Sequence, residues 1–422
     1  MKMPIRVAII GAGDRGNTYS RYALQEPAEM KVVAVAEPNA ERRAQFAQTY
    51  GLTNDSIYDD WEDLLNRPKF CDAVIVTTQD RMHFAPTMKA LRSGYATLVE
   101  KPLSPSLDEC NQMIDLALET DQLFMLGYVL RFTPFFQKIK KLLDQKAIGV
   151  VRHISLDVNV AYWHYAHSFA RGNWNRSEQS SPMILAKCCH DFDILLYLLN
   201  ERCAQLTSFG SLAHFKADRA PIGSSDRCLD GCEVEQSCPF SAKRLYLGEY
   251  TGWPVSTISQ DLSLGGRREA IEMGPYGRCV YRCDNDVVDN QSVLFQFENG
   301  ATATLTMSAF TEKLTRQIRI LGTEGEISGV MEQQSIQLTR FGQSTETIQL
   351  KSSSFGKHAG GDYGLIRSFT QSVRENRKVD LRSLEIIRSS HQLAAFAEQS
   401  RLTGKTIEVR SQSAQGTLAS SY

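Results

Sequence analysis

The sequence has 422 residues, more than one ordinary hydrophobic core accommodates, so we expect two domains. Its 47 Lys and Arg against 48 Asp and Glu give a near-neutral chain, which offers no electrostatic support for nucleic acid or an anionic membrane as the main partner. No apolar run reaches the length of a membrane span and no apolar leader precedes the first predicted strand, so we expect a cytoplasmic protein.

The N-terminal stretch predicts a dinucleotide-binding turn. Residues 5–10 form an apolar run typical of a buried parallel strand, and Gly11, Gly13 and Gly16 follow it at the start of a predicted helix. Gly11 permits the tight turn, Gly13 leaves no Cβ between backbone and phosphate, and Gly16 lets the helix pack closely on the strand. The amides of that helix would face the pyrophosphate.

A second apolar run, residues 31–36, ends in Glu37, at the spacing of about twenty residues typical of dinucleotide-binding folds. A carboxylate there accepts hydrogen bonds from the ribose hydroxyls and repels a 2′-phosphate, so it favours NAD over NADP. Arg15, Arg42 and Arg43 are nearby cations that offer such a phosphate an alternative partner.

Strands and helices alternate over the first part of the chain. After residues 31–36 we predict strands at 71–77, 97–100 and 124–128, and helices at 40–50, 59–65, 83–93 and 107–120. This alternation is typical of a doubly wound parallel sheet, here an NAD-binding Rossmann domain over residues 1–126. Ligands gather at the carboxyl ends of such strands.

The pattern then changes to a second domain, residues 127–410. Strands are predicted at 150–158, 293–298, 302–307 and 317–322, the last three as an antiparallel meander, with helices at 190–199, 365–374 and 383–400. We expect an α+β layer with a mostly antiparallel open sheet, whose bare face would join copies into a homodimer or homotetramer. Residues 215–289 form an irregular, cysteine-containing insertion, and 411–422 a flexible tail.

Glu100-Lys101-Pro102 ends a strand at the predicted cofactor edge. The simpler interpretation is a salt bridge and a turn. The functional one is that Pro102 holds Lys101 in one direction, where a lysine in a desolvated cleft exchanges a proton with a substrate hydroxyl.

A second group of titratable residues enters an apolar helix. Lys187, His190 and Asp193 are spaced three apart, so they share one helix face if the helix extends back to Lys187. A lone histidine is more often structural, but in a chain with a dinucleotide site His190 is the leading acid/base candidate.

With these motifs together, the chain resembles the Gfo/Idh/MocA family, the relatives of glucose-fructose oxidoreductase and inositol dehydrogenase. The elements that carry the resemblance are Gly11-Ala-Gly13-Asp14-Arg15-Gly16, Thr77-Thr78-Gln79 with His83, Glu100-Lys101-Pro102, Arg131-Phe132-Thr133-Pro134 and Cys189-His190-Asp191-Phe192-Asp193.

The resemblance implies a nicotinamide enzyme acting on sugars or cyclitols, with Lys101 and His190 flanking the substrate. The family commonly has an aspartate four residues before that histidine, where this chain has Ala186. Lys187 would then contact the substrate instead, or Asp193 would orient the imidazole.

We name as cofactor-binding Gly11, Gly13, Asp14, Arg15, Gly16, Glu37, Thr77, Thr78, Gln79, His83, Glu100 and Lys101. We name as catalytic Lys101, His190, Lys187 and Asp193.

Aromatic and polar residues after the first strand of the second domain suggest a sugar-binding wall, since aromatic faces stack on pyranose rings. A packed loop is an equal alternative. As substrate-binding residues we name Tyr162 and His164 together with Lys101, Tyr128, Arg131, Lys187 and His190.

Five cysteines of the insertion could bind a structural zinc ion that orders it. The simplest ligand set is Cys228, Cys232, Cys238 and one of Cys279 or Cys283, and we choose Cys283. Reduced, packed thiols are an equal alternative, and an iron-sulfur cluster is a lesser one.

Three functions are compatible with these features. The first is an NAD-dependent oxidoreductase that moves hydride between a sugar or cyclitol hydroxyl carbon and nicotinamide. The second is glycoside cleavage by oxidation, elimination, hydration and reduction with bound NAD. The third, a dinucleotide-sensing subunit, is the least supported because Lys101 and His190 are both retained.

Overall fold

A computed structural model describes residues 3–351 and 358–409, so the predicted tail at 411–422 lies outside the described residues. The chain divides into two compact units. The first comprises Met1–Val151, Cys189–Asn200 and Leu321–Ala395, and the second Arg152–Cys188, Glu201–Ile320 and Phe396–Tyr422. The domain limits 1–126 and 127–410 stay a prediction.

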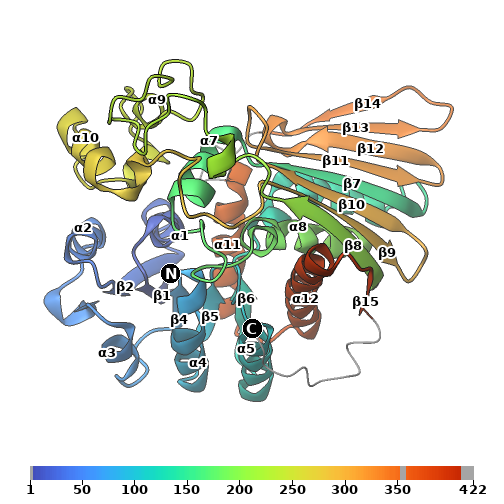
Figure 1. The fold of residues 1–422 in the computed structure, drawn as a ribbon. Helices are drawn as coiled ribbons and strands as arrows, with labels where there is room; N and C mark the ends of the chain where they lie inside the picture. The colour runs from blue at the N-terminus through green and yellow to red at the C-terminus, as the bar shows by residue number, and fades with distance from the viewer. Residues whose placement is uncertain (1–2, 352–357, 410–422) are drawn as a thin grey trace. The chain divides into compact units, whose positions relative to one another are not determined.

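A six-stranded parallel sheet forms the centre of the first unit (Figure 1). Its strand order is β3-β2-β1-β4-β5-β6, the doubly wound order predicted from the alternation of strands and helices. The strands are β1 (Ile5–Ile10), β2 (Met30–Ala36), β3 (Ile57–Tyr58), β4 (Ala73–Val76), β5 (Ala96–Val99) and β6 (Phe124–Leu126). Ile10 lies opposite Ala36 and Val76, so Gly11, Glu37 and Thr77 follow at one edge of the sheet.

Helices alternate with these strands. They are α1 (Asp14–Gln25), α2 (Ala40–Tyr50), α3 (Trp61–Leu65), α4 (Phe84–Arg92) and α5 (Leu107–Thr120), and α6 (Pro134–Asp144), which the sequence analysis left out, follows. Side-chain caps fix several starts: the Asn39 side chain accepts from the amide of Arg42, and Ser106 does the same for Glu109.

The second sheet has nine strands in the order β14-β13-β12-β11-β7-β10-β9-β8-β15. They are β7 (Val151–Asn159), β8 (Cys203–Ser211), β9 (Asn290–Phe297), β10 (Thr302–Ser308), β11 (Thr315–Gly322), β12 (Gly325–Val330), β13 (Ser335–Arg340), β14 (Glu346–Gln349) and β15 (Ile407–Glu408). The predicted meander is correct for β9 and β10, which pair antiparallel, but wrong for β10 and β11, because β7 lies between them and pairs with β10 in parallel.

Three longer helices complete the later chain: α8 (Met183–Leu199), α11 (Gly361–Arg374) and α12 (Leu381–Thr403). The first of them begins seven residues before the predicted start at 190, so Lys187, His190 and Asp193 all lie within one helix.

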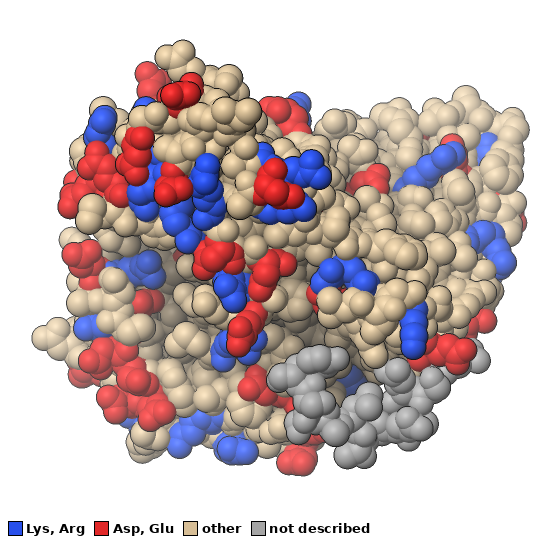
Figure 2. Space-filling view, in the orientation of Figure 1, with Lys and Arg blue, Asp and Glu red and all other residues tan. Residues whose placement is uncertain are grey.

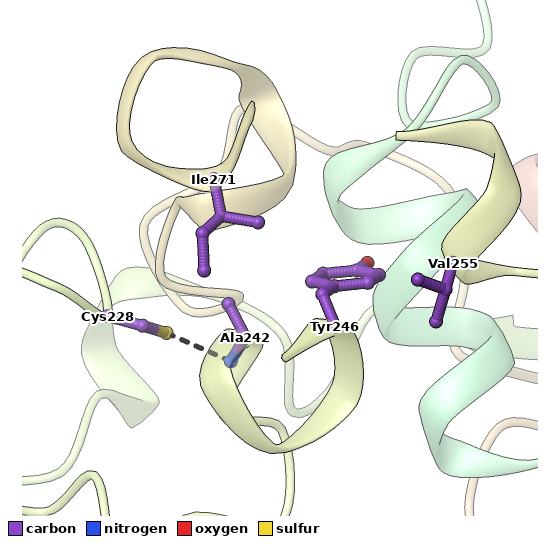
Figure 3. Packing of buried hydrophobic residues seen from close by; sticks show 5 residues of the cluster. All are labelled: Cys228, Ala242, Tyr246, Val255 and Ile271. Atoms are coloured by element: carbon purple, nitrogen blue, oxygen red, sulfur yellow. Dashed lines mark hydrogen bonds between the residues drawn. The ribbon is translucent and has the colours of Figure 1, made fainter. Parts of the chain in front are cut away.

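The insertion at 215–289 has a small hydrophobic core of its own (Figure 3). Its short helices α9 (Ala242–Tyr246) and α10 (Leu264–Met273) contribute Ala242, Tyr246 and Ile271, which pack with Cys228 and Val255. The segment is therefore irregular in backbone but is ordered by apolar packing.

Acidic and basic side chains lie in mixed groups on the face drawn in Figure 2, in keeping with the near-neutral composition. Within residues 3–351 and 358–409, no helix is long and apolar enough to cross a membrane.

The turn between β1 and α1 predicts different costs for two glycine substitutions. A Cβ on Gly16 would lie 2.1 Å from the carbonyl oxygen of Gly11, whereas a Cβ on Gly13 would meet nothing within 4 Å. Gly16→Ala should therefore cost about 1–3 kcal/mol of unfolding free energy, as overpacking does. Thermal unfolding without cofactor measures it, with Gly13→Ala as the matched control. Equal melting temperatures for the two variants would contradict the close helix–strand packing.

Candidate active site

The glycine turn is shaped by its neighbour at the end of β4. Gly11 has φ of +92°, and a Cβ there would lie 2.8 Å from the carbonyl oxygen of Thr77. The Thr77 hydroxyl donates to the carbonyl oxygen of Gly11 at 2.6 Å. With open space beside Gly13, the turn has the form that brings a backbone close to phosphate.

Glu37 supports this turn directly. Its carboxylate is buried, accepting from the amide of Ala12 at 2.8 Å and from the amide of Asn39 at 3.0 Å. Arg43 donates to the main-chain oxygens of Glu37 and Pro38, at 2.6 and 3.1 Å. The acid thus lies at the end of β2, in contact with the glycine turn.

Arg15 lies between two acids. Its Nε donates to Glu100 Oε1 and its Nη2 to Asp362 Oδ1, each at 2.6 Å. Burial alone would lower the pKa of Arg15, but Tyr19 and these two acids raise it well above the ordinary value. The same guanidinium, with His358, holds the pKa of the buried Asp362 well below its usual range despite the opposing effect of burial. Arg15 is therefore already matched by charge within the protein, which disfavours it as the partner of a 2′-phosphate.

Glu100 gathers three donors. Besides Arg15, the Tyr19 hydroxyl donates to Oε1 at 2.7 Å and the amide of Lys101 to Oε2 at 2.6 Å. Burial would raise the pKa of Glu100, but the charges of Arg15 and Lys101 lower it overall. A salt bridge does form at this strand end, between Arg15 and Glu100, and the same carboxylate holds the amide of the partly buried Lys101.

His83 connects two turns of this edge. Its Nδ1 lies 2.8 Å from the carbonyl oxygen of Pro102 and its Nε2 3.0 Å from that of Thr78. The hydroxyl of Thr78 is buried with no hydrogen-bond partner among the described residues, whereas Gln79 and Asp14 are exposed. Of this group, Thr78 has the polar atom best suited to receive a ligand.

His190 is buried in α8, beside two rings of the first unit. Its ring centroid lies 5.8 Å from that of Tyr128 and 6.2 Å from that of His358. The Tyr128 hydroxyl, in turn, lies 2.6 Å from Ser390 Oγ. Burial is the main effect on the Tyr128 phenol and raises its pKa well above the ordinary value. This phenol therefore stays protonated.

Lys101 lies near the same part of α8. Burial raises the pKa of the Cys189 thiol to about 12, and the charge of Lys101 is the largest effect that opposes it. Because Cys189 precedes His190, the structure brings Lys101 and the His190 segment into electrostatic range of each other.

Asp193 is bound by Arg131. The Arg131 Nε donates to Asp193 Oδ2 at 2.7 Å, and Nη2 donates to Oδ1. Burial dominates the pKa of Asp193 and raises it, although Arg131 opposes the shift. The bidentate geometry occupies both carboxylate oxygens, so the structure pairs these two named residues with each other.

The remaining predicted substrate contacts belong to the second unit. His164 is buried among aromatic rings, with its centroid 4.9 Å from Trp253 and 5.8 Å from Trp163. Tyr162 lies edge-on to Phe240 at 6.0 Å. Lys187 is partly buried in α8, one turn before His190.

Four cysteines of the insertion line one pocket. They are Cys228, Cys232, Cys238 and Cys279, and Cys283 does not line it. In the part of the chain that the structure describes, no group of three or more His, Cys, Asp or Glu side chains is arranged to hold a metal ion.

Sequence reasoning missed Asp362, near the start of α11, and His358, four residues earlier. Asp362 contacts both Arg15 and His358. The sequence feature that could have pointed to them is a histidine and an acid spaced one turn apart at the start of an amphipathic helix. No pattern links them to the glycine turn more than 300 residues earlier.

The chain matches two family models. Residues 5–128 match the oxidoreductase family, NAD-binding Rossmann fold, and residues 140–409 match the C-terminal alpha/beta domain of the same family. The chain is 23% identical to the putative oxidoreductase YteT of Bacillus subtilis, over 76% of this chain and 77% of that protein. It is 26% identical to scyllo-inositol 2-dehydrogenase (NAD(+)) of the same organism, over 50% of this chain and 59% of that protein.

Among solved structures, it resembles an oxidoreductase from Agrobacterium radiobacter in complex with NAD+, L-tartaric acid and magnesium. The TM-score is 0.70 at 16% identity, over 97% of this chain and all of that one, and this likeness concerns the fold. Because the two family models together span both sheets and nearly all of the described chain, the protein belongs to the Gfo/Idh/MocA oxidoreductase family.

Proposed function

We propose that the protein is an NAD-dependent dehydrogenase that oxidises a hydroxyl-bearing carbon of a sugar or cyclitol. The observation that carries the proposal is the convergence of Lys101, Tyr128 and His190 in the first unit, beside the glycine turn of a family of NAD-binding oxidoreductases. A lysine amine and an imidazole near one another suit proton exchange with a hydroxyl. The relatives that act on inositol support the substrate class.

The residues present suit a dinucleotide. The turn at Gly11–Gly16 and the amides of α1 would hold the pyrophosphate, Glu37 would bind the ribose, and the buried hydroxyl of Thr78 would donate to the cofactor. When bound, NAD supplies the acceptor for the hydride. Asp14, Gln79 and His83 remain proposed contacts of this edge, with His83 acting through the backbone that it holds.

The proton of the substrate hydroxyl would pass to Lys101 or His190. The backbone of Lys101 is fixed by Glu100, which limits the directions its side chain can take. His190 is held by the α8 backbone and lies against Tyr128. Asp193 and Arg131 would not touch the substrate, but their ion pair would support α8. Lys187 would contact the substrate from the same helix.

NAD is proposed over NADP because a 2′-phosphate would meet the buried carboxylate of Glu37. Of the nearby cations, Arg15 is bound to Glu100 and Asp362, and Arg43 to main-chain oxygens.

Glycoside cleavage with bound NAD stays an alternative, because it would use the same groups without net redox change. The two reactions separate in one assay. Net formation of NADH from a polyol supports the dehydrogenase, and sugar release without NADH supports cleavage.

Self-association through the second sheet is also proposed. Phe209 and Leu294 are 68% and 48% exposed, and the register of β8 and β9 puts both on one face. An exposed apolar face of this kind favours a homodimer or homotetramer. A cytoplasmic location stays a prediction from the sequence.

We further propose one structural zinc ion in the insertion, apart from the redox chemistry. Four cysteines around one pocket support it. Tyr162 and His164 remain proposed substrate contacts, although their aromatic packing favours the alternative of a packed loop.

Cofactor binding gives the first test of the dehydrogenase. Wild-type protein should bind NAD more tightly than NADP in a calorimetric or fluorescence titration. Gly13→Val should abolish binding of both, because two methyl groups would occupy the space beside the turn, while its melting temperature without cofactor stays near that of the wild type. Binding of NADP at least as tight as that of NAD would remove the role given to Glu37.

Turnover gives the second test. Lys101→Met and His190→Ala should each lower the turnover number by about 100-fold or more, the size of effect expected for acid/base groups, with NAD affinity nearly unchanged. Lys31→Met is the matched control, since this exposed lysine lies at the opposite end of β2 from Glu37. Polyols including scyllo-inositol serve as probes, with NADH absorbance as the signal.

Lys187→Met tests whether Lys187 takes over the role of the aspartate that the family commonly has where this chain has Ala186. A comparable loss of turnover would support substrate contact by Lys187. Near-normal turnover of any of these three variants would show that the assigned role of that residue is wrong.

A further inference from the structure

The insertion forms a pocket in which sulfur atoms meet backbone donors. The Cys228 sulfur accepts from the amide of Ala242 at 3.4 Å (Figure 3). Cys232, Cys238 and Cys279 line the same pocket. Backbone amides pointed at sulfur stabilise thiolates, the form in which cysteine binds a metal.

A buried cation lies at the same pocket. Arg171 is 2% exposed, and its Nη2 lies 3.6 Å from the Cys228 sulfur. The same Nη2 donates to the carbonyl oxygen of Phe240 at 2.8 Å, and Nε donates to that of Arg278 at 2.7 Å. Nη1 is buried without a hydrogen-bond partner among the described residues.

No carboxylate forms an ion pair with Arg171 in the described ranges. The one acid lining the pocket, Glu235, is engaged by Ser241 at 2.5 Å and Lys243 at 3.5 Å. A buried guanidinium without an acid is costly, and a negatively charged group in this pocket would offset that cost.

We propose that Cys228, Cys232, Cys238 and Cys279 bind one zinc ion and that Arg171 is its buried counter-charge. This assignment rests on the structural zinc ion of the proposed function and replaces Cys283 by Cys279 as the fourth ligand. On binding, each thiol releases one proton to solvent, and four thiolates with Zn²⁺ leave two negative charges. Arg171 offsets one of them and donates to sulfur, as outer-shell groups of metal sites do.

Cys283 serves a different purpose. It is not among the residues that line the pocket, and its thiol donates to the carbonyl oxygen of Cys279 at 3.3 Å. Zn–S bonds of about 2.3 Å require the four pocket sulfurs to close inward from their described positions.

Metal content of matched variants tests the assignment. Full-length protein purified without a histidine tag should contain one zinc per chain by elemental analysis. Cys279→Ser should lose it and become sensitive to protease in the insertion, whereas Cys283→Ser should keep it. Arg171→Met should lower zinc affinity by about 10–100-fold in competition with a chelator, and Arg171→Lys should restore part of the loss.

The outcomes separate the two levels of the proposal. Wild-type protein without zinc, and unable to bind added zinc after reduction, overturns the zinc ion itself. Zinc that is lost in Cys283→Ser and kept in Cys279→Ser overturns the ligand set alone.

Should Cys279→Ser not fold, the absorption spectrum of the cobalt-substituted wild-type protein decides. Tetrahedral bands with strong sulfur charge transfer support four thiolates, and bands of a mixed oxygen or nitrogen site contradict them. NAD affinity should be unchanged throughout.

Discussion

The partly buried guanidinium of Arg15 is the constraint on which the first unit depends. It bridges Glu100, 85 residues along the chain, and Asp362, 347 residues along. The two carboxylates are 5% and 3% exposed, so removing Arg15 would leave two buried acids without their shared cation, typically at a cost of about 3–5 kcal/mol. One side chain therefore fixes the glycine turn, the Glu100-Lys101 turn and the start of α11 relative to one another.

Five strands of the first sheet could be predicted because each is a short, mostly buried apolar run that ends in a turn. The two-residue β3, which is only partly buried, has no such run and was missed. Much of the second sheet could not. β13 has the sequence Ser-Ile-Gln-Leu-Thr-Arg, with four of its six positions polar, and β12 carries two glycines, so neither has a strong strand signal. The position of β7 between β10 and β11 depends on pairing between distant segments, which local patterns do not record.

For the candidate site, single functional residues could be predicted from the sequence, but the residues that they contact could not. Glu37, Lys101 and His190 occur in motifs, so they could be named before any coordinates. That Asp193 binds Arg131, and that Arg15 is held by Asp362, follows from segments 62 and 347 residues apart. In the insertion, the cysteines were visible but the apolar cluster around Tyr246 and Ile271 was not, because its members are scattered singly among polar residues.

The parallel pairing of β7 with β10 also bears on the order in which the chain can fold. His153 lies opposite Thr302, so the middle of the second sheet cannot close until 149 further residues have left the ribosome (302 − 153). Contacts so distant in sequence carry a large loop-closure entropy and slow folding. The local core of the insertion lies within this stretch and can condense early, which shortens the effective loop that β7 and β10 must close. An insertion that looks like an appendage would thereby act as an internal aid to assembly of the sheet.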